Sequence, residues 1–348
     1  MHDPKDYRTK VSHGMIQGTR LNCSQNSIGE NGLMPLDFVV STIKLLVSGF
    51  LLLLFAFSVH ANTTDKDILI VYKKSQGFSQ QLIDQLQHNL SNQNYSVSKM
   101  LLEPQQLDIL AIKNPSLIIA IGSQTTKTLL DANITTPILS ALIPRHISSS
   151  LSEKYPNRKN WSSLLIDQPL NRQFRLITTL LGPNKKTGVL LGPYTKDLTK
   201  PLQAISVNSP HKIKIEEIKN SDELTTSLKA LSNKSNVLLT LPDPVIYNKS
   251  TIRGVLLLAY RNKLPIIGFS QAYVRAGAIA AIYSEPEQIS EQIINISASY
   301  FINNEFEKKE YYPDDFSVAL NKNVARSLGI KLSANKAIIR QIKKAEMQ

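Results

Sequence analysis

Short, continuously apolar runs alternate with amphipathic helical patterns from residue 67 onward. Runs of this kind, rich in Ile, Leu and Val and bounded by Pro, Gly or Ser, are typical of parallel strands covered on both faces by helices. In the first half they fall at 67–72, 95–101, 117–122 and 137–143, with helical patterns between them. The pattern predicts a first α/β unit built on a parallel sheet.

A second series of the same kind begins after a helical stretch at 170–181. This stretch ends at Gly182-Pro183, a C-cap glycine followed by a residue that cannot continue the helix. Strands are predicted at 186–193, 237–242 and 265–270. The run 212–218 alternates charged and apolar residues, which predicts a half-exposed strand near a sheet edge. The chain therefore divides into two α/β halves of similar size.

The last part of the chain adds a small-residue strand and a capped helix. Ser284 and Glu287 have the spacing of an S-x-x-E capping box, with Pro286 in the first turn. We expect these late elements to return to the first half. The predicted organisation is an extension at 1–33 that is non-native or disordered, a signal peptide at 34–61, lobe I at 62–168 with 276–348, and lobe II at 169–275.

The signal peptide is predicted from an uncharged apolar run of 15 residues at 45–59. Lys44 precedes it, and Val59-His60-Ala61 places small residues at the cleavage positions, so the mature chain begins at Asn62. The alternative is an uncleaved anchor, but 15 helical residues rise only about 22 Å against a hydrocarbon core of roughly 30 Å. Cys23 lies ahead of the run, so no lipid anchor is expected. These features predict a periplasmic protein.

Composition narrows the class of function. Of 348 residues, 42% are hydrophobic and 19% charged, which excludes a disordered chain. One cysteine excludes an internal disulfide and a multi-cysteine zinc site. Residues 62–348 keep 35 Lys or Arg against 23 Asp or Glu, and we expect this excess to form a solvated surface, because it lacks aromatic interleaving and any nucleic-acid motif. No catalytic, metal or cofactor motif is present.

Three segments resemble a known family. They are LTLPDPVIYN at 239–248, the stretch 260–289 that contains PIIGFSQAYVRAGAIAAIY, and VALNKNVARSLGI at 318–330. They are similar to periplasmic substrate-binding components of ABC transporters, in the branch related to tryptophan-type binding proteins, and the resemblance runs along nearly all of 65–335. It implies the type I periplasmic-binding fold, in which two Rossmann-like lobes joined by three crossovers close on a ligand.

Ligands of open α/β sheets bind beyond the carboxyl ends of the strands, where loops and helix N-termini present free amides. The predicted ligand-binding residues of the first half are Ser75, Gln76, Phe78, Ser123, Gln124 and Thr125. For Phe78 the alternative is a core-facing ring, and for Ser123 it is a helix N-cap. Arg145 and His146 are candidates for a positive rim of the site, and the alternative for both is a solvated loop.

The predicted ligand-binding residues of the second half are Tyr194, Thr195, Asp243, Ser270 and Tyr273. Asp243 precedes a proline, so it is also a candidate N-cap for a helix that begins there. Asp167 lies near an expected crossover, either as a helix cap or as a cleft acid, and Gly277 marks a close backbone approach. A helix start in one lobe and a carboxylate in the other suit a zwitterionic ligand such as an amino acid.

The sequence thus predicts a monomeric solute-binding protein, not an enzyme, that delivers a small molecule to the membrane permease of an ABC transporter. The alternative is a ligand sensor or regulator of the same fold that acts on a membrane receptor or an envelope enzyme. An enzyme in the interlobe cleft is a third reading, which no motif supports.

Overall fold

The structure, a computed structural model, describes residues 66–73, 75–103, 106–208 and 210–347. The predicted signal peptide, the upstream extension and Lys74 lie outside the described residues. The chain from Thr63 to Gln348 forms one compact unit, and within it the strands form two separate sheets. In the described part of the chain, no helix combines the length and apolar character needed to cross a membrane.

Lobe I is built on a six-stranded sheet in the order β11-β5-β4-β3-β1-β2. Its strands are β1 (Asp67–Tyr72), β2 (Ser96–Leu101), β3 (Leu117–Ile121), β4 (Ile138–Ile143), β5 (Trp161–Leu165) and β11 (Glu310–Tyr311). All pair in parallel. Every residue of β3 and β5 is buried, as expected for central strands that are covered on both faces.

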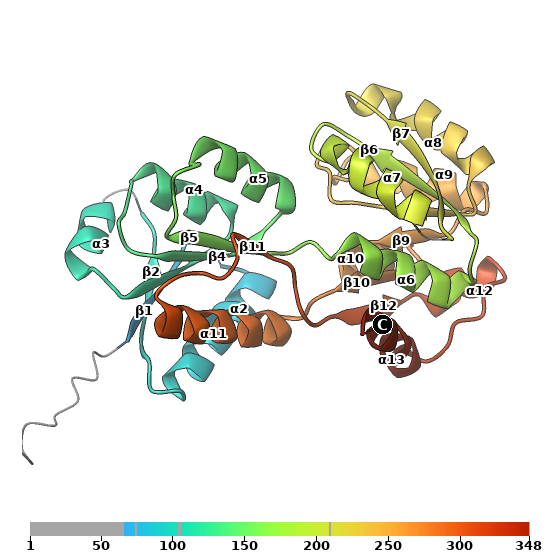
Figure 1. The fold of residues 1–348 in the computed structure, drawn as a ribbon. Helices are drawn as coiled ribbons and strands as arrows, with labels where there is room; N and C mark the ends of the chain where they lie inside the picture. The colour runs from blue at the N-terminus through green and yellow to red at the C-terminus, as the bar shows by residue number, and fades with distance from the viewer. Residues whose placement is uncertain (1–65, 74, 104–105, 209, 348) are drawn as a thin grey trace, which may run out of the picture. The chain divides into compact units, whose positions relative to one another are not determined.

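Helices cover both faces of this sheet (Figure 1). They are α2 (Phe78–Ser91), α3 (Leu107–Lys113), α4 (Ser123–Asp131), α5 (Arg145–Lys154) and α11 (Pro286–Asn303). One apolar cluster joins α2 and α11 to the sheet through Leu82, Leu86 and Ile293. A second joins α3, α4 and α5 on the other face, around Trp161. Lobe I is therefore a three-layer α/β/α unit.

Lobe II has a second six-stranded sheet in the order β12-β10-β9-β8-β6-β7. Its strands are β6 (Lys186–Leu191), β7 (Lys212–Glu217), β8 (Val237–Leu239), β9 (Ile266–Gly268), β10 (Ala280–Tyr283) and β12 (Ser317–Leu320). Only the β10–β12 pair is antiparallel. The charged strand β7 lies at an edge, which confirms the prediction from its alternating pattern.

The helices of lobe II are α6 (Leu170–Leu181), α7 (Thr199–Asn208), α8 (Leu224–Lys234), α9 (Ile252–Arg261), α10 (Gln271–Ala276), α12 (Lys322–Ser327) and α13 (Asn335–Glu346). Two short 3-10 turns, η2 (Lys196–Leu198) and η3 (Ser221–Glu223), precede α7 and α8. Phe174 of α6 and Ile338 of α13 share one apolar cluster with the sheet, whereas Leu228 of α8 and Val255 of α9 share the other.

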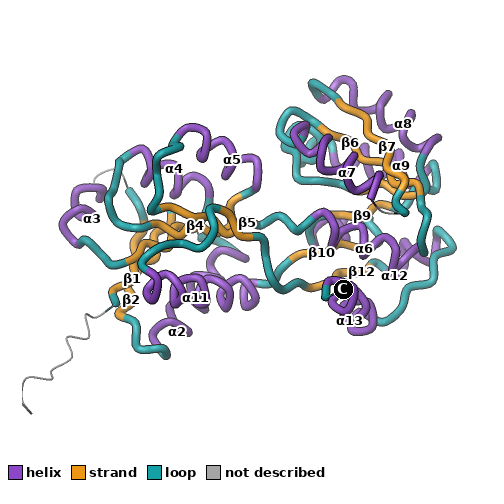
Figure 2. The backbone as a smooth tube through the Cα atoms, in the orientation of Figure 1, coloured by secondary structure: helices purple, strands orange, loops and turns teal. Residues whose placement is uncertain are grey.

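Three loop segments connect the two sheets: β5 to α6, β10 to α11, and β11 to β12 (Figure 2). The sequence expectation placed all of 276–348 with lobe I. The strand pairing instead puts β10 and β12 in the sheet of lobe II, and α13 packs on that sheet. Only α11 and β11 return to lobe I.

The helix that begins after β10 is capped one residue later than predicted. Glu285 is the N-cap of α11, and its carboxylate and the Gln288 side chain satisfy each other's backbone amides in a capping box. The expected Ser284–Glu287 box is wrong, because the Ser284 hydroxyl donates to the Asp315 carbonyl at 2.7 Å and accepts from Gln168. Pro286 lies in the first turn, as predicted, and stands at the first helical position.

Candidate functional site

Loops at the carboxyl ends of strands from both sheets line one small cavity. Lobe I contributes Arg145 and His146 after β4, Asp167 and Gln168 after β5, and Tyr312 after β11. Lobe II contributes Tyr194, Thr195 and Leu198 after β6, and Leu241 and Pro242 after β8. Leu170 and Gln173 of α6 complete the lining. The cavity volume is about 20 Å³, room for about one water molecule.

Arg145, which lines this cavity, connects the two lobes. Its guanidinium donates to both carboxylate oxygens of Asp197, at 2.5 Å from Nη1 to Oδ2 and 2.7 Å from Nη2 to Oδ1. The Arg145 side chain is 14% exposed and the Asp197 side chain 53%. Burial alone would raise the pKa of the Asp197 carboxyl, but the hydrogen bonds and charge of Arg145 outweigh it, so this pKa lies below its ordinary value. The pair is a bidentate ion pair at the surface of the cleft.

The backbone of Arg145 is fixed by a second acid. The Arg145 amide donates to Oδ2 of Asp167 at 2.7 Å, so Asp167 caps the first turn of α5 from a neighbouring strand end. Burial raises the pKa of Asp167, while the Arg145 amide and the Arg145 charge oppose this shift. Asp167 therefore lines the cavity and also caps the first turn of α5.

Two rings meet beside the ion pair. His146 and Tyr194 lie edge to face, with ring centroids 5.1 Å apart and an interplanar angle of 60°. Burial lowers the pKa of His146; the carboxylate of Asp243 opposes this shift and the neighbouring Arg145 charge adds to it. The imidazole is therefore mainly neutral at pH 7. Tyr194 remains 46% exposed, so its ring is accessible to a molecule in the cleft.

Asp243 organises the turn of lobe II that carries Tyr194. Its Oδ2 accepts from the Tyr194 amide and the Thr195 hydroxyl, each at 3.0 Å, and its Oδ1 accepts from the Val245 amide at 2.9 Å. Gly192 makes this possible, because a Cβ there would lie 2.7 Å from Oδ2 of Asp243. The expected helix does not begin at Asp243: a turn follows, and α9 begins at Ile252. The carboxylate is thus satisfied within lobe II.

The lobe I residues predicted for ligand contact follow β1 and β3 along the chain, and none of them lines this cavity. The Thr125 hydroxyl accepts from the Lys73 amide at 3.1 Å, which joins the first turn of α4 to the loop after β1. Ser123 is the first residue of α4 and not its N-cap; the cap is Gly122, whose φ of 87° excludes most other residues. Phe78 packs against the lobe I core, as in its alternative reading.

The remaining residues predicted for ligand contact lie in both lobes, and none of them lines the cavity. Ser75 is half-buried and Gln76 exposed, with the Gln76 amide donating to Ser79, and Gln124 is exposed in the first turn of α4. In lobe II, Ser270 caps α10 by its backbone position. Tyr273 packs with Phe269 at a centroid distance of 4.3 Å. Ligand contact by these residues stays a prediction.

Sequence reasoning missed three polar residues that line the cavity, Gln168, Gln173 and Tyr312, and it missed Asp197, which pairs with Arg145. Asp197 follows Tyr194 by three residues, so its place in the same loop was a usable signal. Tyr312 precedes Pro313 at a crossover whose position the sequence did not reveal. Among the described residues, no group of three His, Cys, Asp or Glu side chains is placed to hold a metal ion.

Comparison with known proteins assigns the chain to a family. The family model described as ABC transporter substrate binding protein matches residues 70–338. No curated protein sequence matches the chain.

Solved structures share the fold at low sequence identity. A substrate-binding protein with adhesive properties from Clostridium difficile, in a ligand-free, open structure, has a TM-score of 0.63 and 19% identity over 78% of this chain and 97% of its own. An ABC domain in complex with L-Trp from Streptococcus pneumoniae has a TM-score of 0.53 and 16% identity over 80% and 98%. A conserved domain protein from Vibrio cholerae has a TM-score of 0.53 and 21% identity over 80% and 98%. The chain belongs to the ABC transporter substrate-binding proteins, and its two lobes have the type I periplasmic-binding fold.

Proposed function

We propose that the protein binds a small zwitterionic molecule, such as an amino acid, between its lobes and delivers it to a membrane permease in the periplasm. The observation that carries this proposal is the charge arrangement of one cavity. Arg145 and Asp167 of lobe I line it, and Asp197 of lobe II forms an ion pair with the Arg145 guanidinium. An α-carboxylate and an α-amine need opposite charges of this kind at short range.

The Arg145–Asp197 pair suggests how such a ligand is received. The Asp197 carboxylate occupies both donor sites of the Arg145 fork, and a ligand carboxylate has the same planar geometry. Exchange of one for the other leaves Asp197 and Asp167 as acceptors for the amine. Because a cavity of about 20 Å³ cannot hold an amino acid, the loops must separate first, and a ligand that contacts both lobes then favours their closure.

The rings at the cavity support an organic ligand rather than an inorganic ion. Tyr194 and His146 present aromatic surface beside the charges, and binding sites of small molecules combine apolar walls with a few fixed polar groups. L-Trp is bound by the Streptococcus pneumoniae relative, which makes aromatic amino acids the first candidates to test here.

The test is calorimetric titration of the protein with each amino acid, followed by Arg145→Gln. Loss of a charged hydrogen-bond donor costs roughly 1.5–3 kcal/mol, so affinity should fall by about ten- to a hundredfold. Arg340→Gln is the matched control, since Arg340 is exposed on α13 in lobe II. Binding that is equally strong in both variants, or that requires no carboxylate on the ligand, would reject the proposed site.

A further inference from the structure

Lobe II has a strongly basic surface that the proposed cleft does not use. Residues 244–284 contain five Lys or Arg and residues 316–345 contain seven, and neither stretch contains an Asp or Glu. Residues 62–348 hold 35 basic and 23 acidic residues, so everything outside these two stretches is balanced at 23 of each. The entire net charge of +12 therefore comes from two segments, and both belong to lobe II.

The two segments meet at an apolar groove. A groove of about 630 Å³ runs between α9, the end of α10 and α12, and Leu256, Gly277 and Val324 are among its lining residues. Leu257 and Tyr260 of α9 also line it and are 48% and 51% exposed. The charge excess is thus combined with exposed apolar side chains, in contrast to the uniformly solvated surface that the sequence led us to expect.

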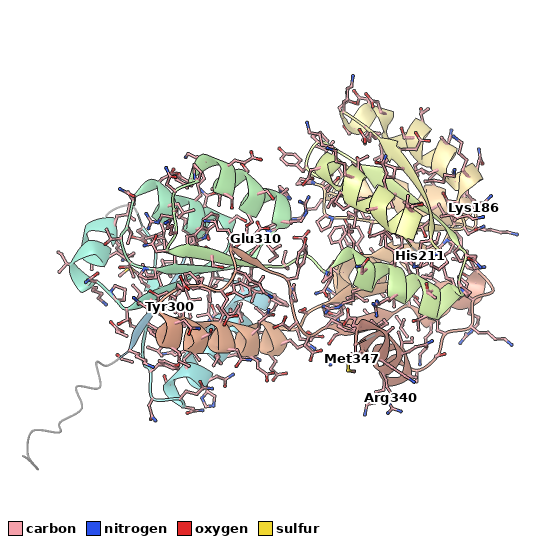
Figure 3. All side chains as sticks on the ribbon, viewed as in Figure 1. Lys186, His211, Tyr300, Glu310, Arg340 and Met347 are labelled. Atoms are coloured by element: carbon pink, nitrogen blue, oxygen red, sulfur yellow. The ribbon has the colours of Figure 1, made fainter. Side chains whose placement is uncertain are left out.

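The basic side chains around the groove are not neutralised. Lys249 and Arg253 line it, Arg261 ends α9, and Arg275 and Lys322 line an adjoining groove of about 530 Å³. In the part of the chain that the structure describes, none of these five forms an ion pair. Figure 3 shows a further basic residue of this lobe, Arg340, projecting away from α13. An anionic partner would meet these charges without competition from internal acids.

The exposed side chains of α9 favour a lipid surface as the partner. Leu257 lines the grooves on both sides of the helix, so it stands on a ridge between them and not at the bottom of a matched pocket. On the same side of α9, exposed Arg253 and Arg261 flank Leu257 and Tyr260. A helix face with apolar and tyrosine side chains between cations is typical of segments that lie at a membrane interface.

We propose that lobe II docks through this α9 face on an anionic phospholipid surface. Basic side chains then contact lipid phosphates while Leu257 and Tyr260 enter the headgroup region. Each basic residue close to such a surface strengthens association by about fivefold, and salt weakens it. Docking of this kind would keep the protein near a membrane without an anchor in lobe II.

The test uses Thr63–Gln348, the compact unit with its own apolar cores, sedimented with phosphatidylcholine vesicles that contain or lack phosphatidylglycerol. We expect binding only to the anionic vesicles, with a decrease as ionic strength rises. Arg253→Gln with Arg261→Gln should weaken binding by about thirtyfold, and Leu257→Ser should weaken it further. All three positions are exposed, so the variants should keep the circular dichroism spectrum and melting behaviour of the parent.

The matched control removes two exposed basic residues of lobe I, Lys113→Gln with Lys127→Gln. Equal loss of vesicle binding in the control and in the α9 variant would overturn the proposal, because net charge alone would then explain it. Absence of binding to the anionic vesicles would also overturn it. Binding of soluble polyglutamate at Arg253 and Arg261 without vesicle binding would reassign the face to an acidic protein partner.

Discussion

The carboxylate of Asp243 is 2% exposed and accepts three hydrogen bonds inside lobe II. An asparagine there keeps one acceptor oxygen and turns its amide group toward at least one N–H or O–H that now donates to the acid. We expect Asp243→Asn to lower the free energy of unfolding by about 1–3 kcal/mol, the cost of an unsatisfied buried polar group. Urea titration measures this change.

Asp222→Asn is the control, because Asp222 is exposed in η3. Ligand titration separates the two roles of Asp243. Direct contact predicts weaker binding of amine-bearing ligands alone, whereas a disordered Tyr194 turn predicts weaker binding of every ligand. Unchanged stability together with unchanged affinity would contradict the role assigned to this carboxylate.

The lowered pKa of His146 should make the free energy of unfolding depend on pH. Burial lowers its pKa in the folded protein, so the unfolded chain takes up a proton near pH 6.5 while the folded chain takes it up only at a lower pH. The stabilising contribution of neutral His146 to the free energy of unfolding is therefore complete above pH 6.5. It is lost as the pH falls toward the pKa of His146 in the folded protein.

Urea titrations at pH 7 and about pH 5.5 measure this loss. His211, whose pKa burial also lowers, contributes in the same direction. His146→Gln should consequently show a smaller fall than the parent, not the absence of one. Parallel pH profiles of parent and variant would contradict the prediction.

Sequence reasoning at the residue scale was limited by partners that are distant along the chain. The C-terminal strand ends identify Tyr194, Asp243 and Arg145 as candidates, because that rule needs only the strand positions. It cannot show that Asp243 is already bonded to Tyr194, 49 residues away, or that Arg145 pairs with Asp197, 52 residues away. Those pairings decide which polar groups remain available to a ligand.

At the scale of single elements, the cap of α11 gives a sharp stability test. Glu285→Ala removes the acceptor for the Gln288 amide and the acceptor for the Tyr283 hydroxyl. We expect a loss of about 1 kcal/mol or more in the free energy of unfolding. Gln288→Ala removes only the reciprocal arm to the Glu285 amide and should cost less.

Glu291→Ala provides the reference for this series, since Glu291 is exposed in the middle of α11. Thermal unfolding followed by circular dichroism ranks the three variants. If Glu285→Ala and Glu291→Ala melted at the same temperature, the capping box would be without measurable effect.

The sequence predicts most helices and strands correctly, but it does not always predict the residue at which a helix begins. Both Ser284–Glu287 and Glu285–Gln288 have capping-box spacing, so the choice depends on tertiary contacts. The Ser284 hydroxyl is held by Gln168 and Asp315, which leaves Glu285 to cap the helix. Likewise, Gly122 replaces Ser123 as the cap of α4 because the chain leaves β3 with a positive φ.

At the scale of the whole molecule, the Arg145–Asp197 pair predicts how the lobes respond to a single charge. Asp197→Asn removes the charged half of a contact that joins them. Because the Asp197 side chain is about half exposed, we expect the pair to contribute about 1 kcal/mol, so the population of separated lobes should rise by about fivefold. Small-angle scattering should show a larger radius of gyration, and a bound amino acid should reduce it.

Asp131→Asn is the matched control, because Asp131 pairs with Lys154 inside lobe I. It should leave the radius of gyration unchanged. The same increase in both variants would show that Asp197 does not act through contact between the lobes.

The sequence did not predict correctly how the chain is divided between the lobes, because β10, β12 and α13 belong to lobe II. The apolar runs of β10 and β12 predict strands, and small residues such as Ala280 and Ala281 predict close packing, but neither property identifies the sheet. The Ala280–Ile267 pair attaches β10 to β9 of lobe II, and the Ile282–Val318 pair adds β12 to the same sheet. Non-local strand pairing follows from the complete set of packed faces, which a local pattern does not contain.

The three crossovers have a consequence for how the protein is made. Lobe I includes α11, whose Ile289, Ile293 and Tyr300 cover the same cluster as Leu82 and Leu86 of α2. A chain that emerges from its amino end therefore leaves this face of lobe I covered by α2 without α11 until most of lobe II has been synthesised. Pairing across such long sequence separations slows folding and exposes apolar surface meanwhile. A chain that ended within lobe II before α11 would leave lobe I without α11 and β11, so lobe I can be completed only after most of lobe II has been synthesised.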